Sequence, residues 1–173
     1  MSPIKHVFLV SALSGALLIS AAQAAPSTFF DNLSGSWSGS GKAYTSKYGD
    51  VSASCRVAIT GAETRVAISG SCGILVFRRA LGLSIRNAGG NRYVGTYTGS
   101  TTGPAKLEGT LKGNRLVMII RWGALVNGDR TAQMVLERTG PNSFAQIVKD
   151  RVEGKSRSTS NFAFVRANVQ AAN

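Results

Sequence analysis

Histidine is almost absent from this chain of 173 residues: the one histidine, His6, lies near the N-terminus. General acid–base catalysis near neutral pH uses histidine most often, and carboxylates with shifted pKa values next. The eight acidic residues mostly lie beside turns or next to basic residues, as in Asp129-Arg130 and Asp150-Arg151, which is typical of solvated ion pairs. No G-x-S-x-G, P-loop or EF-hand motif is present. We therefore expect no enzymatic activity and no catalytic residue.

Long apolar stretches are also missing beyond the N-terminus. Residues 1–24 combine Lys5, an apolar run over 7–20 and the small-residue site Ala22-Gln23-Ala24, which together are typical of a cleaved secretory signal. The run is shorter than the roughly 20 residues of a membrane span, so an uncleaved anchor is the less favoured alternative. We expect one mature domain over residues 25–173, periplasmic or secreted, with no transmembrane segment and without His6.

Cysteine is scarce too, with two residues in the chain. Zinc would need more ligands than Cys55 and Cys72 provide, whereas one disulfide is common in an exported protein. Residues 51–72 alternate apolar and polar on both sides of a turn, and a hairpin in which Ile59 opposes Ile68 also sets Cys55 opposite Cys72. The sequence therefore predicts a disulfide-linked hairpin, in which the bond contributes roughly 3 kcal/mol.

A second hairpin follows from the same alternation over residues 105–122. A turn at Gly113-Asn114 sets Leu111 opposite Leu116, and the same register sets Leu107 opposite Ile120. The opposite face is then basic but also carries two apolar residues that need cover from a loop or a partner. The predicted outward-facing residues are Lys106, Glu108, Thr110, Arg115, Arg121, Val117 and Ile119.

Glycine is abundant, with 20 residues, and short alternating runs separated by turn residues continue along the chain. This pattern predicts an all-β fold, an antiparallel up-and-down meander barrel of about eight to ten strands whose closure removes exposed edges. For residues 74–86 we favour one or two strands, with a short lid helix as the alternative, and we expect a basic loop near residues 149–157. Further strands are expected over residues 33–44, 92–98, 131–138, 143–149 and 161–166.

Residues 33–41 contain the pattern G-x-W-x-G-x-G, which resembles the opening strand of calycins: lipocalins, fatty-acid-binding proteins and nitrobindin-like barrels. In those folds the tryptophan closes one end of the barrel and a basic residue of the last strand lies over it. The resemblance therefore implies that Trp37 and Arg166 form a barrel-end plug. Another small barrel or sandwich is the alternative. Nitrobindin-like barrels bind haem through a histidine, which the mature chain lacks, so we expect no haem, other cofactor or metal.

The barrel interior has two possible states that the sequence does not separate. A small barrel either fills with its own side chains or holds one small ligand, and Gly70, Gly95 and Gly109 either leave room or curve the sheet. For an apolar or amphipathic, lipid-like ligand, an anionic head would meet rim arginines. The candidate contacts are Arg78, Arg79, Tyr93, Tyr97, Met118, Phe162 and Phe164.

The net charge of +12 gives a second hypothesis. Outward-facing cations such as Arg56 and Arg65 would attract an anionic polymer, membrane surface or protein, so the chain could be an envelope interaction module or inhibitor. Nucleic acid is not expected, because no aromatic stacking platform lies among the basic residues. A third hypothesis, an outer-membrane barrel, is disfavoured because the predicted outward faces carry Arg, Lys, Ser and Thr.

Overall fold

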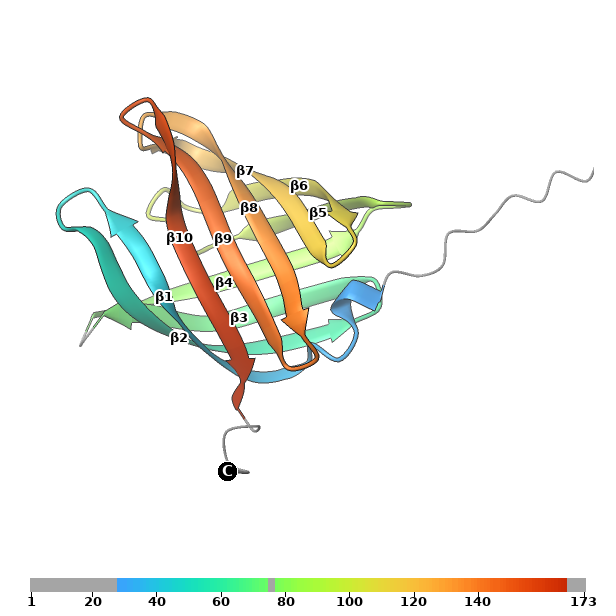
Figure 1. Ribbon diagram of the computed structural model, residues 1–173. Coiled ribbons are helices and arrows are strands. Elements are labelled where there is room, and N and C mark those ends of the chain that lie inside the picture. The colour runs from blue at the N-terminus through green and yellow to red at the C-terminus, as the bar shows by residue number, and fades with distance from the viewer. Residues whose placement is uncertain (1–27, 75–76, 168–173) are drawn as a thin grey trace, which may run out of the picture.

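Ten antiparallel strands form one sheet that closes on itself (Figure 1). This computed structural model describes residues 28–74 and 77–167. Each strand pairs with its neighbours in sequence, and β1 pairs with β10 to complete the barrel, so the predicted all-β meander is confirmed. The elements are η1 (Thr28–Phe30), β1 (Gly35–Thr45), β2 (Gly49–Ala62), β3 (Arg65–Ile74), β4 (Phe77–Asn87), β5 (Arg92–Tyr97), β6 (Ala105–Lys112), β7 (Arg115–Val126), β8 (Asp129–Gly140), β9 (Ser143–Val152) and β10 (Lys155–Arg166).

Both predicted hairpin registers are confirmed. In β2 and β3, Ile59 pairs with Ile68 and Cys55 with Cys72, and these cysteines form the predicted disulfide. In β6 and β7, Leu111 pairs with Leu116 and Leu107 with Ile120. Alternation fixes these registers because a shift by one residue would turn every apolar side chain toward solvent.

Two local expectations are corrected. The alternative of a lid helix over residues 74–86 is wrong, because residues 77–87 are strand β4 and Ile74 ends β3. The expected basic loop over residues 149–157 is instead the end of β9, a tight turn and the start of β10. Lys149 and Arg151 lie on the outer face of β9 and alternate with the buried Asp150 and Val152, so the basic residues belong to a strand.

The predicted outward apolar pair on β7 is partly covered by the sheet itself. Val117 pairs with Val135 of β8, which in turn pairs with Ile147 of β9. The three side chains form a cross-strand row in which Val135 is 4% exposed. Ile119 lies at the edge of the row and is 41% exposed.

Gly70 and Gly109 allow close strand approach rather than making room for a ligand. A Cβ on Gly70 would lie 2.2 Å from the Arg56 carbonyl oxygen, and one on Gly109 would lie 2.0 Å from that of Val117. Both contacts are with backbone of the neighbouring strand, which cannot move aside without disrupting the sheet. Gly95 is similarly tight, with a Cβ 2.2 Å from the Ser84 carbonyl oxygen. A side chain at any of these three positions would force the neighbouring strands apart.

The two ends of the barrel differ (Figure 1). One end, called the closed end here, carries η1 and the hairpins β2–β3, β4–β5, β6–β7 and β8–β9. The other end, called the mouth, carries the hairpins β1–β2, β3–β4, β5–β6, β7–β8 and β9–β10. Buried apolar side chains concentrate toward the closed end, and they include Phe30, Ile59, Val66, Ile85, Leu116 and Met118.

The disulfide indicates an oxidising, non-cytosolic compartment. The predicted secretory signal, residues 1–24, lies outside the described residues, so export itself stays a prediction. Within residues 28–74 and 77–167, no helix is long and apolar enough to span a membrane.

Removing the disulfide tests its contribution to stability. The double variant Cys55→Ala/Cys72→Ala should lose roughly 3 kcal/mol of unfolding free energy, because the bond closes a loop of 17 residues in the unfolded chain. Urea denaturation followed by circular dichroism measures this loss. A reductant should lower the stability of the wild type to that of the double variant and leave the variant unchanged. Equal midpoints for oxidised wild type and variant would contradict a stabilising role.

Candidate functional site: the plugged end and the open cavity

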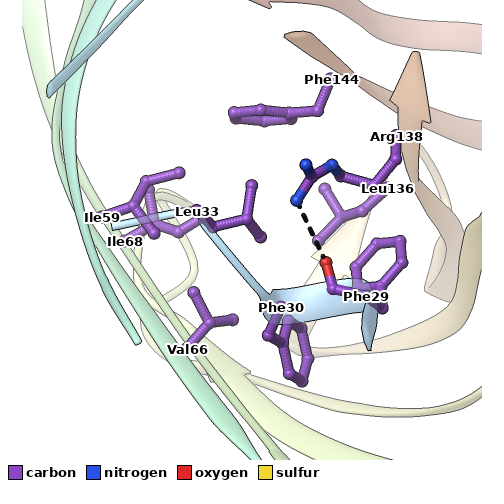
Figure 2. Close-up of a pocket in the computed structure, with 9 residues that line it drawn as sticks. All are labelled: Phe29, Phe30, Leu33, Ile59, Val66, Ile68, Leu136, Arg138 and Phe144. Atoms are coloured by element: carbon purple, nitrogen blue, oxygen red, sulfur yellow. Dashed lines mark hydrogen bonds between the residues drawn. The ribbon is translucent and has the colours of Figure 1, made fainter. Parts of the chain in front are cut away.

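Aromatic and aliphatic side chains fill the closed end. Phe29 and Phe30 of η1, together with Leu33, line one small space with Val66 and Phe144 (Figure 2). Phe29 meets Phe30 edge to face with ring centres 5.3 Å apart. The space left among these side chains is about 20 Å³, roughly enough for one water molecule. The closed end therefore has no room for a larger ligand.

Trp37 lies at the centre of this plug and is 1% exposed. Its indole Nε1 donates a hydrogen bond to the Leu33 carbonyl oxygen at 2.8 Å, so its polar atom is satisfied. Its ring meets Phe144 edge to face, with centres 5.0 Å apart. The guanidinium carbon of Arg166 lies 4.6 Å from the centre of the Trp37 ring. The two residues that the calycin resemblance pairs are thus brought together, as direct partners in the β1–β10 register.

Arg166 also ties three segments of backbone together. Nη1 donates to the Ser34 carbonyl oxygen at 2.6 Å, and Nη2 donates to that of Asn32. Nε donates to Oδ1 of Asn142, in the β8–β9 turn, at 3.0 Å. The last strand is thereby fastened to the segment before β1 and to the neighbouring hairpin.

Arg138 is a second arginine that binds the segment before β1, and its role was not predicted from the sequence. Its Nη1 donates to the carbonyl oxygens of Asp31, at 2.8 Å, and Phe29, at 3.4 Å (Figure 2). Burial and then the charge of Arg166 lower the pKa of Arg138, while Asp31 opposes the shift. A signal was present, because Arg138 continues the inward alternation of Met134 and Leu136 along β8.

A cavity of about 670 Å³ occupies the other half of the barrel and extends to the mouth. Its floor includes Leu136 and Phe144, directly above the plug, and at the rim it reaches Phe77 and Arg78, which are exposed. Most of its wall is apolar. The wall includes Val57, Ile68, Leu81, Met134 and Val148.

Five of the seven candidate ligand contacts lie on the cavity wall. These are Arg78, Arg79, Tyr97, Phe162 and Phe164. Tyr93 and Met118 are not part of the wall: Tyr93 is 1% exposed and meets Phe30 of the plug, and Met118 is fully buried. Both point inward, as alternation predicts, but they lie in the filled half of the barrel.

Hydrogen-bond donors gather on one side of the cavity, where Arg79, Tyr97 and Trp122 form what we call the donor cluster. The rings of Tyr97 and Trp122 meet edge to face at 6.3 Å. Burial raises the pKa of the Tyr97 phenol, and the nearby charge of Arg79 offsets part of that shift. The indole Nε1 of Trp122 is buried, and no described residue accepts a hydrogen bond from it. Buried donors normally have partners, so the cluster suits a ligand that brings acceptor oxygens.

Asp150 faces the cavity from β9, which corrects the expectation of a solvated ion pair with Arg151. It is 4% exposed, and its Oδ2 accepts a hydrogen bond from Nδ2 of Asn127 at 3.0 Å. Its Oδ1 accepts a hydrogen bond from the backbone N–H of Arg151 at 2.7 Å. Alternation explains the position, because Val148, Asp150 and Val152 all point inward.

The described residues contain no group of three or more His, Cys, Asp or Glu side chains that could hold a metal ion. Comparison with known proteins finds no protein-family model and no curated protein that matches this chain. Its function must therefore be inferred from the plug, the cavity and the distribution of charge.

Replacing Arg166 tests the plug. Arg166→Met should lower the unfolding free energy by about 2–4 kcal/mol, because it removes the cation–π contact and leaves backbone carbonyls without a donor. The matched control is Arg56→Met, which removes an exposed arginine from the outer wall. Urea denaturation of both variants gives the comparison. If the two variants were equally stable, Arg166 would not hold the closed end.

Proposed function

We propose that this chain is an exported, non-catalytic binding protein that holds an apolar or amphipathic, lipid-like molecule in its barrel. The observation that carries the proposal is the cavity of about 670 Å³ with a mainly apolar wall. Small-molecule sites have volumes of about 300–1,000 Å³, apolar walls and a few polar groups that orient the ligand. The cavity above the plug has all three properties.

We further propose that the barrel is calycin-like. It is supported by the closed meander, by Trp37 beneath Arg166, and by the short η1 turn that fills the same end. The ten strands exceed the eight of lipocalin barrels, so within the calycins the lipocalins are not the best match.

The cavity has different surfaces for the two parts of an amphipathic ligand. The apolar wall would hold an acyl chain, and each buried methylene would contribute about 0.8 kcal/mol. The donor cluster and Arg78 would meet an anionic head. Arg78 has no carboxylate partner among the described residues, and its Nη1 donates to Oγ of Ser71 at 3.4 Å. A fatty acid or a similar amphiphile combines both requirements.

Binding rather than catalysis also fits the acidic group in the cavity. The two oxygens of Asp150 already accept hydrogen bonds, from Asn127 and from the Arg151 backbone. The predicted mature chain, residues 25–173, contains no histidine and would therefore lack the most common proton-transfer group.

An interaction module that binds anionic partners is the second candidate function. Outward-facing cations on the barrel wall favour it, and each is exposed as the registers predict. They are Arg56, Arg65, Lys106, Arg115 and Arg121. Arg115 is partly neutralised by Glu137, whose Oε2 lies 3.4 Å from its Nε. Such binding would weaken steeply with salt, whereas binding in the cavity would not.

Filling the cavity tests the proposed function. Ala53 of β2 lines the cavity, so Ala53→Trp should weaken binding of a fluorescent fatty-acid analogue by about tenfold or more, because the indole occupies the space of the chain. The control is Ala58→Trp, on the outer face of the same strand. Equilibrium fluorescence titration measures both. Equal affinities for the two variants, or no binding by wild type, would refute the proposal.

The role of the donor cluster requires a separate variant. Arg79→Met should weaken binding of a long-chain carboxylate by about tenfold and leave the affinity for the alcohol of equal chain length unchanged, because only the carboxylate needs the cation. Arg86→Met, on the outer face of the same strand, is the control. Competition titrations against the fluorescent analogue supply these affinities. A parallel loss for acid and alcohol would assign Arg79 a packing role instead.

A further inference from the structure

Three large apolar side chains extend into solvent at the mouth. Tyr48 is 65% exposed, Phe77 75% and Leu125 63%, more than any other large apolar residue of the described chain. They belong to separate hairpins: Tyr48 lies in the β1–β2 turn, Phe77 begins β4, and Leu125 is near the end of β7. All three hairpins open on the end of the barrel opposite η1 (Figure 1). Single exposed apolar residues are ordinary, but three around one opening form a common surface.

A cation accompanies each of these apolar tips. Nζ of Lys47 lies 4.9 Å from the centre of the Tyr48 ring, and Arg78 follows Phe77 directly. On the hairpin of Leu125, Arg130 donates from Nη1 to the Gly123 carbonyl oxygen at 3.0 Å. The three ion pairs of the described residues involve other cations, and none of them includes Lys47, Arg78 or Arg130.

We propose that the mouth docks on an anionic lipid bilayer. Tyr48, Phe77 and Leu125 enter the headgroup region, while Lys47, Arg78 and Arg130 contact lipid phosphates. Interfacial binding needs apolar insertion and attraction to anionic lipids together, and the mouth provides both on the same hairpins. A soluble anionic polymer would use the cations alone. A folded protein partner would need a continuous apolar centre, whereas here the centre is the opening of the cavity.

Docking in this orientation places the cavity opening against the bilayer. The rim residues Phe77 and Arg78 line the cavity as well as the mouth, so the two surfaces are continuous. A lipid-like ligand would then pass between bilayer and barrel without exposure of its chain to water. This consequence rests on the proposed function, but docking itself does not.

Vesicle flotation tests the docking. The probes are large unilamellar vesicles of phosphatidylcholine with and without phosphatidylglycerol, and the wild type should float only with the anionic vesicles. Tyr48→Ser/Phe77→Ser/Leu125→Ser should weaken that binding by about tenfold or more. The control Ile119→Ser/Val165→Ser removes exposed apolar side chains from the outer wall, 41% and 40% exposed, and should float like wild type.

A charge series separates the mouth from the general basicity of the chain. Lys47→Ser/Arg78→Ser/Arg130→Ser should weaken flotation by about fivefold for each cation removed. Arg56→Ser/Arg65→Ser/Arg86→Ser has the same net charge, but removes cations from the outer wall, and should retain most of the binding. The proposal would be overturned if the two charge variants floated equally. It would also be overturned if Tyr48→Ser/Phe77→Ser/Leu125→Ser floated like the wild type. Binding that does not require Tyr48, Phe77 and Leu125 but is abolished by dextran sulfate would also overturn it. That result would identify an anionic polymer as the partner.

The variant Ala53→Trp, whose cavity is filled, separates the proposal of ligand binding from the proposal of membrane docking. It should float with anionic vesicles like wild type while losing the fluorescent fatty-acid analogue. Flotation of a wild type that binds no fatty acid would support docking and refute the proposed ligand. Fatty-acid binding in vesicle-free buffer without any flotation would refute docking alone.

Discussion

Arg166 and Trp37 meet where the sheet must close, and the rest of the barrel depends on that contact. The two residues are partners in the β1–β10 register, and the guanidinium lies 4.6 Å from the ring centre. Because Arg166 also holds the carbonyl oxygens of Ser34 and Asn32, the segment that carries η1 is drawn across the barrel end. One side chain therefore joins the last strand to the segment before the first strand and holds the aromatic plug in place. The large cavity lies on the side of the mouth.

That asymmetry accounts for the cavity. Aromatic side chains of η1, β1 and β9 fill one half, while at the other end smaller residues such as Ala43 and Ala53 face the interior. The polar groups in the open half form separate sets: the donor cluster on β4, β5 and β7, and Asp150 with Asn127 near the β7–β8 and β9–β10 turns. Gln146 and Ser160, which are hydrogen-bonded to each other, also line the cavity. An apolar chamber with polar groups at its walls is what an amphipathic ligand requires.

Much of the fold could be predicted from the sequence because side-chain direction in a strand repeats every two residues. The Cys55–Cys72 pair, the β6–β7 register and the inward direction of Tyr93 and Met118 all follow from that period. The two-residue period does not show how far along the barrel axis an inward side chain lies. The sequence therefore does not assign Tyr93 to the plug rather than to the wall of the ligand cavity. The size of the cavity depends on side-chain volumes from all strands at once. The burial of Asp150 does not follow from the sequence, because the adjacent Arg151 makes a solvated ion pair the simpler expectation.

The central claim is that the open half of the barrel holds one lipid-like molecule. Native mass spectrometry of the delipidated mature chain, incubated with a mixed lipid extract, tests it most directly. The account predicts a complex of one chain with one lipid, enriched in long-chain amphiphiles that carry an anionic or acceptor-rich head. The bare chain mass at every lipid ratio, under conditions that preserve the fold, would contradict it.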